Sequence, residues 1–128
     1  MLIDSSVIVK FFSKEPGWEK LETYIAENLT LRLALIELGS GLSKKVRKNE
    51  ITQDLALILL KEYSEKAVIL DETKYLPLAF EYAMAHNIKI YDSLFIAAAL
   101  QGGYSLISCD RRQCNVAESL GIEVIRCY

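Results

Sequence analysis

The chain has 128 residues, of which 52% are hydrophobic and 25% are charged, so it is long enough for one domain and apolar enough for a sizeable core. This composition excludes an intrinsically disordered chain, which combines few hydrophobic residues with a strong net charge. The formal charge of −2 excludes a protein that coats nucleic acid through its overall charge, although a local basic patch or bound divalent cations can still hold a phosphate backbone. We expect a single domain over residues 1–128.

Neither a targeting segment nor a disulfide framework is predicted. The chain starts without the basic residues and long apolar stretch of a signal peptide, and the longest uncharged apolar run, residues 94–100, is too short to cross a bilayer. The cysteines are odd in number and clustered late in the chain, at Cys109, Cys114 and Cys127. We therefore expect a cytoplasmic protein without membrane association, and a bridge between two of the cysteines stays open.

In the first half of the chain, short apolar runs alternate with helical patterns. Leu2 and Ile3 form a short apolar run that ends in Asp4, a preferred helix N-cap. Trp18, Leu21 and further apolar positions recur at helical spacing. The patterns predict strands over residues 2–3 and 31–35, and helices over residues 7–12, 18–29, 36–46 and 52–64.

The second half continues the alternation. We expect strands over residues 68–70, 88–91, 105–108 and 123–126, and helices over residues 71–87, 94–100 and 111–120. Gly102 and Gly103 end one of these helices and Gly121 ends another. Strands that alternate with helices predict an α/β protein, here a three-layer α/β/α sandwich with a central parallel sheet.

Four acidic residues fall close to the ends of the predicted strands. Asp4, Asp92 and Asp110 stand at strand-to-helix junctions, and Glu37 stands near the start of the helix that follows the second strand. The carboxyl ends of parallel strands meet at one edge of a sheet, where ligands bind. Each aspartate taken singly is explained as well by helix capping. Glu37 has no such explanation, because it lies between apolar neighbours where an unpaired carboxylate is costly to bury.

Together the four acids indicate metal chemistry. Gathered carboxylates repel one another, which raises their pKa values unless cations neutralise them. Mg²⁺ and Mn²⁺ prefer such oxygen ligands, and in phosphodiester hydrolysis they activate water and stabilise the developing charge. The constellation therefore favours a metal-dependent enzyme that acts on phosphodiesters.

Four blocks around these acids resemble the PIN-domain ribonucleases, most closely the VapC-type toxins of toxin–antitoxin pairs. The blocks are IDSSV at residues 3–7, ALIELGSGL at 34–42, IYDSLFIAAAL at 90–100 and LISCDRR at 106–112, and their order spans nearly the whole chain. The resemblance implies a PIN-like fold and Mg²⁺- or Mn²⁺-dependent endonucleolytic cleavage of RNA. It also implies a homodimer and a cognate antitoxin that covers the acid cleft. By matching position, the residues it implies are Asp4, Glu37, Asp92 and Asp110 as catalytic, metal-binding acids, with Ser6 and Ser108 as supporting hydroxyls.

Basic residues near the acids are candidates for binding the RNA substrate. Arg111 and Arg112 adjoin Asp110 directly, where relatives carry basic residues. Lys44 and Lys45 belong to a basic helix end, which is more often simply solvated.

Three interpretations stay open. A toxin and a housekeeping PIN-domain nuclease would share this sequence pattern, and a non-catalytic module that binds metal in an acidic pocket is a third. A receiver-like module is disfavoured because Asp4 stands alone at the start, without a paired acid. Gln113 and Asn115 occupy the stretch where relatives carry a further acid, which leaves open whether one or two metal ions bind.

Overall fold

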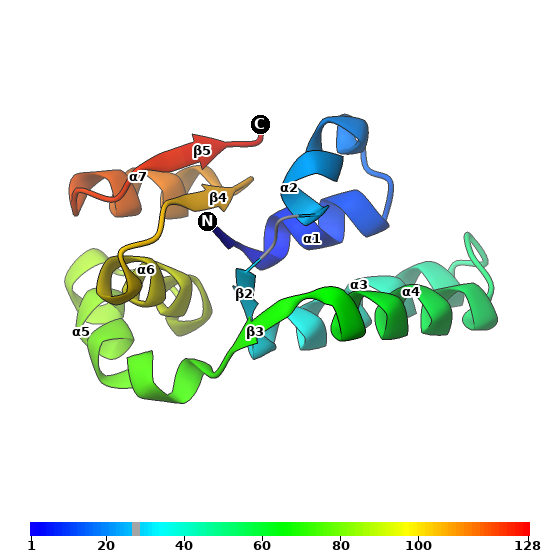
Figure 1. The fold of residues 1–128 in the computed structure, drawn as a ribbon, viewed down its shortest axis with the longest axis horizontal. Coiled ribbons are helices and arrows are strands. Elements are labelled where there is room, and N and C mark those ends of the chain that lie inside the picture. Colours follow the sequence, from blue (N-terminus) through cyan, green and yellow to red (C-terminus); the bar gives the residue numbers. More distant parts are fainter. Residues whose placement is uncertain (27–28) are drawn as a thin grey trace.

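The computed structural model describes residues 1–26 and 29–128 (Figure 1). Its centre is a parallel sheet of five strands in the order β3-β2-β1-β4-β5. The strands are short: β1 (Leu2–Ile3), β2 (Leu29–Leu31), β3 (Val68–Leu70), β4 (Leu106–Ser108) and β5 (Val124–Arg126).

Helices cover both faces of this sheet, which confirms the three-layer α/β/α prediction. On one side α1 packs on α3 and α3 on α4, and on the other side α5 packs on α6 and α6 on α7. Figure 1 shows the long α3–α4 pair projecting at one end of the molecule and the α5–α6 pair lying at the other. The helices are α1 (Ser5–Phe12), α2 (Glu22–Ala26), α3 (Arg32–Arg47), α4 (Gln53–Lys66), α5 (Leu76–His86), α6 (Ile90–Gly102) and α7 (Arg111–Ser119), with 3₁₀ turns η1 (Trp18–Leu21) and η2 (Glu72–Tyr75).

The core lies around the two central strands and α6. Leu2, Ile3, Leu106 and Ile107 are fully buried, and every residue of α6 from 93 to 99 is buried. A helix that is apolar on all sides is stable only when it is enclosed. The core therefore fixes β1, β4 and the start of α6 rigidly relative to one another.

The chain order creates a switch point between β1 and β4. From β1 the chain moves outward to β2 and β3, and it then crosses back to place β4 on the other side of β1. In sheets of this kind a crevice forms where the winding direction reverses, at the carboxyl ends of the strands. Asp4 and Asp110 follow the two strands that border this point.

Two strand predictions were wrong. The strand predicted over residues 31–35 is β2, which ends at Leu31, and α3 begins at Arg32. Residues 88–91 form no strand: Asn87 ends α5 in a left-handed conformation with φ of 51°, and α6 begins at Ile90. Ile88 and Ile90 pack against the core although they belong to a loop and to the start of a helix. Their alternation with polar residues therefore resembled that of a strand.

The remaining predicted elements agree with the structure, with shifted ends. The helix predicted over residues 18–29 is divided into η1 and α2, residues 27 and 28 lie outside the described part, and Leu29 belongs to β2. In the described part of the chain no helix is both long and apolar enough to span a membrane.

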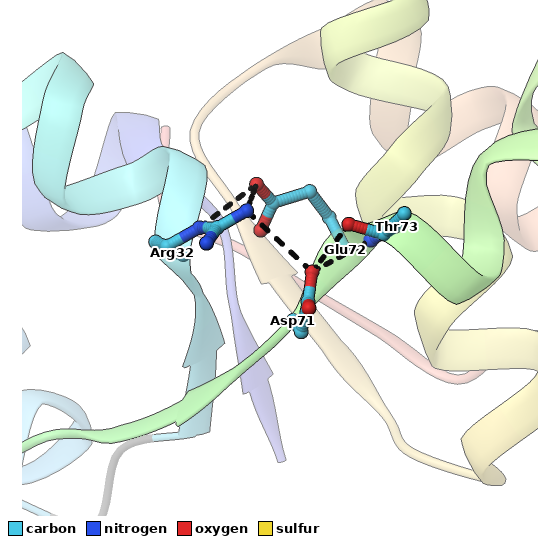
Figure 2. A network of polar contacts seen from close by, with 4 residues as sticks. All are labelled: Arg32, Asp71, Glu72 and Thr73. Atoms are coloured by element: carbon cyan, nitrogen blue, oxygen red, sulfur yellow. Dashed lines mark hydrogen bonds and ion pairs between the residues drawn. The ribbon is translucent and has the colours of Figure 1, made fainter.

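An exposed ion-pair network joins the carboxyl ends of β2 and β3 (Figure 2). The guanidinium of Arg32 lies 3.4 Å from the carboxylate of Glu72 and 3.6 Å from that of Asp71. Asp71 in turn caps η2, since its Oδ1 accepts hydrogen bonds from the backbone N–H of Thr73 at 3.0 Å and from the Thr73 hydroxyl. The network links the start of α3, at Arg32, to η2 at the outer end of the sheet.

Candidate active site

Asp4 lies at the carboxyl end of β1 and is the N-cap of α1. Its side chain is buried, and Oδ2 accepts hydrogen bonds from the backbone N–H of Ser6 at 3.1 Å and from the Ser6 hydroxyl. The cap thus uses one of the two carboxylate oxygens.

Two buried polar side chains, Ser108 and Gln113, hold Asp4 from the other side. Gln113 donates through Nε2 to Asp4 Oδ1 at 3.2 Å and to the backbone carbonyl of Asp92 at 3.1 Å. Ser108 Oγ lies 2.6 Å from Gln113 Oε1 and 3.2 Å from Asp4 Oδ2, and it accepts the N–H of Asp110 at 3.0 Å. Because a hydroxyl has one hydrogen, Ser108 donates to only one of these two acceptors at a time. Gln113 therefore connects the segments that carry three of the acids.

The other acids come from three different helices. Asp110 is the N-cap of α7, where its Oδ1 accepts the N–H of Gln113 at 2.8 Å. Asp92 was expected at a strand-to-helix junction, but no strand precedes it: it is the third residue of α6, whose N-cap is Lys89. Glu37 lies in the second turn of α3. Capping thus accounts for the placement of Asp4 and Asp110 but not for Asp92 or Glu37.

All four acids line one open cavity of about 430 Å³ at the switch point. Its wall also contains polar and small residues from α1, the turn after it and the end of β4: Ser5, Ser6, Val9, Glu15 and Cys109. The structure therefore brings together the four acids and Ser6 around a common space, with Ser108 behind Asp4.

The pKa values show that these carboxyl groups are buried near like charges. Burial raises the pKa of Asp4 and that of Glu37, and in Glu37 the charge of Asp4 raises it further. Burial also raises the pKa of Asp92 to about 6, with further contributions from the charges of Asp4, Asp110 and Glu37. Like charges that raise one another's pKa in this way attract a cation.

Basic side chains adjoin the acids on one side. A neighbouring cavity of about 530 Å³ shares Asp92 and Asp110 and is also lined by Lys89 and Arg112. Arg112 additionally lies 3.4 Å from the backbone carbonyl of His86. This pair of cations stands directly beside Asp92 and Asp110, on a chain of net negative charge.

The other basic residues named from the sequence lie apart from both cavities. Arg111 stacks over the ring of Tyr128 at 4.2 Å, and Lys45 pairs with Glu50 at 3.2 Å. Lys44 is exposed in the last turn of α3. Neither these lysines nor Arg111 line the acid cavity or its neighbour.

Sequence reasoning missed three residues at the site. Lys89 was hidden because residues 88–91 resembled a strand, although it stands only three positions before Asp92. Glu15 lines the acid cavity from the turn after α1, and no motif marks it. Gln113 was named from the sequence only because it stands where relatives carry a further acid, and its hydrogen bond to Asp4 was not foreseen. Its position on the buried face of a short helix directly after Asp110 was a usable signal.

The donor set fits a hard divalent cation, although the side chains do not enclose one as they stand. Within residues 1–26 and 29–128, no three His, Cys, Asp or Glu side chains close around a common point as a preformed metal cage. Mg²⁺ does not need such a cage, because it retains several waters and is held by one or two carboxylates. Four carboxylates around an open cavity, with the pKa values of Asp4, Glu37 and Asp92 raised, suit that mode of binding.

The parallel α/β sandwich and the acids gathered at its switch point both agree with membership of one known family. The PIN domain family matches residues 1–119, and the chain belongs to this family. The resemblance noted in the sequence blocks is thereby confirmed at the level of the family.

Individual relatives point the same way. Ribonuclease VapC3 of Pyrobaculum aerophilum is 29% identical over 118 residues, which cover 88% of this chain and 90% of the relative. The crystal structure of PAE2754 from the same organism aligns with a TM-score of 0.74 at 20% identity, over 96% of this chain and 81% of that one. A toxin–antitoxin complex from Klebsiella pneumoniae aligns with a TM-score of 0.67 at 18% identity, over 99% and 97% of the two chains. At these identities the solved structures show a shared fold.

Proposed function

We propose that the chain is a Mg²⁺- or Mn²⁺-dependent endoribonuclease and the toxin of a toxin–antitoxin pair. The observation that carries the proposal is the convergence of Asp4, Glu37, Asp92 and Asp110 on one open cavity, beside a cavity lined by cations. The name of the Pyrobaculum relative, a VapC ribonuclease, supports the choice of RNA as substrate. A cytoplasmic location, where that RNA is found, belongs to the same proposal.

In this proposal the four acids hold the metal, and the residues behind them set their geometry. Ser6, Ser108 and Gln113 fix the orientation of the Asp4 carboxylate through hydrogen bonds to both its oxygens. Bound Mg²⁺ or Mn²⁺ supplies activation of water and stabilisation of negative charge on the phosphodiester. Outer partners of this kind keep metal ligands in productive orientation.

Substrate binding falls mainly to the cations beside the acids. Lys89 and Arg112 line the adjoining cavity, where they would bind phosphate groups of the RNA on either side of the bond that is cut. Arg111, Lys44 and Lys45 lie farther out and would contact longer RNA only.

An apolar surface suits the antitoxin. Residues of α3 and α4 line a cavity of about 410 Å³, and on α4 Leu57 and Ile58 are 62% and 52% exposed. Such a groove accepts the apolar face of a partner helix. A second exposed apolar stripe, at Leu76, Phe80 and Met84 of α5, suits contact with a second copy in a homodimer.

The test of catalysis is cleavage of a mixed structured RNA by the wild-type protein and by Asp92→Asn, with Mg²⁺, Mn²⁺ or EDTA. Cutting by the wild type alone, lost in EDTA and restored by either metal, is expected. Cleavage at the same rate with and without EDTA would contradict the metal mechanism. If neither protein cuts although calorimetry detects Mn²⁺ binding, the non-catalytic acidic-pocket module is the better interpretation.

The test of the toxin role is co-expression with the product of a small reading frame that adjoins the gene. A stable complex that suppresses cleavage, and that Leu57→Glu disrupts, is expected. Absence of such a reading frame, with cleavage that the cell tolerates, would favour a housekeeping PIN-domain nuclease instead.

A further inference from the structure

Two of the three free thiols lie opposite each other at the ends of neighbouring strands. β4 and β5 pair in parallel up to Ser108 and Arg126, so the next residues in register are Cys109 and Cys127. The hydrogen-bond ladder reaches this point, because the N–H of Cys127 donates to the carbonyl of Ser108 at 3.0 Å. The pairing thus arises from the sheet and not from a flexible tail.

This geometry suits a disulfide. Neighbouring strands are about 4.8 Å apart, and the Cα atoms of a disulfide are roughly 4.4–6.8 Å apart. The register Ser108–Arg126 and the bond from Cys127 N–H to Ser108 O place Cys109 and Cys127 side by side on these two strands. A bond between them therefore requires little movement of the backbone.

Cys109 and Cys127 are partly exposed, whereas the third cysteine, Cys114, is buried. Cys109 is half-buried and lines the acid cavity, and Cys127 is half-buried and lines a separate cavity of about 370 Å³. Cys114 is fully buried on α7, where its Sγ faces the carbonyl of Ser108 at 3.6 Å. An oxidant in solution therefore has access to Cys109 and Cys127, which are partly exposed, before it has access to the enclosed Cys114.

We propose that Cys109 and Cys127 form an intramolecular disulfide on exposure to a small-molecule disulfide. One cysteine attacks a sulfur of the reagent RSSR, forms a mixed disulfide and releases one RSH. The other cysteine then attacks the protein sulfur of the mixed disulfide and releases the second RSH. The balance is two protein thiols plus RSSR giving one protein disulfide and two RSH, so the reagent is reduced and the protein oxidised.

The bridge restrains the turn that carries Asp110. The N–H of Cys109 donates to Ser6 Oγ at 3.0 Å, and the next residue is the N-cap of α7. A covalent link to Cys127 fixes this turn against β5 and closes a loop that contains α7. Loop closure of this size limits the unfolded chain, so the oxidised protein melts at a higher temperature.

The experiment treats the folded wild type, Cys127→Ser, Cys109→Ser and the control Cys114→Ser with oxidised glutathione, and then maps disulfide-linked peptides by mass spectrometry. We expect a Cys109–Cys127 peptide in the wild type and in Cys114→Ser, and a rise in melting temperature of about 10 °C that dithiothreitol reverses. The Cys127→Ser and Cys109→Ser proteins should carry only a glutathione adduct and show no such rise.

Three results would overturn the proposal: a linked peptide that contains Cys114, a wild type that stops at the glutathione adduct, or no reaction at any thiol. Peptide mapping of the wild type distinguishes these results from the expected bridge even if a serine variant fails to fold, and it needs no cleavage assay. Failure to form the disulfide would therefore leave the proposed nuclease activity unaffected, and loss of the nuclease proposal would leave the disulfide unaffected.

Discussion

Two groups of acids lie at the same edge of the sheet and differ in how their charge is handled. At the β2–β3 end, Asp71 and Glu72 face the guanidinium of Arg32 (Figure 2). The hydrogen bonds from Thr73 lower the pKa of Asp71, with a smaller contribution from Arg32, and this side chain is exposed. At the β1–β4 switch point, the pKa of Asp4 and of Asp92 is raised instead, by burial first.

The comparison shows that a carboxylate after a strand does not by itself indicate a site. Asp4 and Asp71 both follow a parallel strand, and both cap the helical turn that comes next. Asp71 has a cation beside it and open solvent, so its charge is satisfied within the protein. Asp4 is buried among further acids and accepts hydrogen bonds from Ser6, Ser108 and Gln113, an arrangement that favours binding of a cation.

The largest contrast is expected between Asp4→Asn and Asp71→Asn. Asparagine caps helices as well as aspartate does, so both variants should fold. Asp4→Asn removes the charge of a proposed metal ligand and should lower the RNA cleavage rate by more than the roughly 10–100-fold that loss of an outer partner costs. Asp71→Asn should leave the rate unchanged. Equal rates for the two variants in a Mn²⁺ cleavage assay would remove Asp4 from the site.

A smaller loss is expected for Gln113→Ala, because this amide donates to Asp4 Oδ1 and would act on a bound metal only through that carboxylate. We expect cleavage to fall about 10–100-fold, with a matching weakening of Mn²⁺ binding in calorimetry. Asn115→Ala is the control, since Asn115 lies on the same helix with its side chain toward Arg126 at 3.3 Å. Unchanged Mn²⁺ affinity in Gln113→Ala would mean that the amide only fills space.

The acid cluster should also affect stability in the absence of metal. The pKa of Asp92 is about 6 in the folded protein against an ordinary value of 3.8. Between these values the folded state binds a proton that the unfolded state does not, so the free energy of unfolding falls as pH rises through this window. In EDTA at pH 7, Asp92→Asn should therefore melt a few degrees above the wild type, and the two should converge at pH 4. A variant that melts below the wild type at pH 7 would contradict the repulsion that the structure indicates.

The smallest effect is expected at the exposed network. Arg32→Ala removes both ion pairs. Arg32 and Asp71 are 59% and 65% exposed, whereas the Glu72 side chain is 18% exposed. Because Arg32 is itself exposed, we expect the pairs to contribute at most about 1 kcal/mol and salt to screen them. Urea denaturation should show that the free energy of unfolding falls by no more than about 1 kcal/mol, and that this loss is smaller in high salt. A much larger loss would mean that the network holds β3 onto the sheet.

The sequence predicted much of the fold because its signals are local. Apolar runs placed β1, β3, β4 and β5 closely, and the helix predicted from residue 52 is α4, of which Thr52 is the N-cap. Where local signals were ambiguous they failed: residues 88–91 alternate like a strand, yet Asn87 and the packing of α6 into the core make them a loop and a helix start. Periodicity over four residues cannot separate these outcomes.

For the site, residue type and element order were enough to select the four acids and to predict that they meet at one edge, although the strand expected before Asp92 is absent. Their surroundings became visible in the folded chain: the burial of Asp4, the amide of Gln113 behind it, and the cations Lys89 and Arg112 beside Asp92. The tertiary structure also decided that Cys109 and Cys127 face each other across β4 and β5 while Cys114 is enclosed. Residue type and spacing act between neighbours along the chain, so they predict local structure. Burial, charge compensation and strand register depend on residues far apart in sequence, which only the packed sheet brings together.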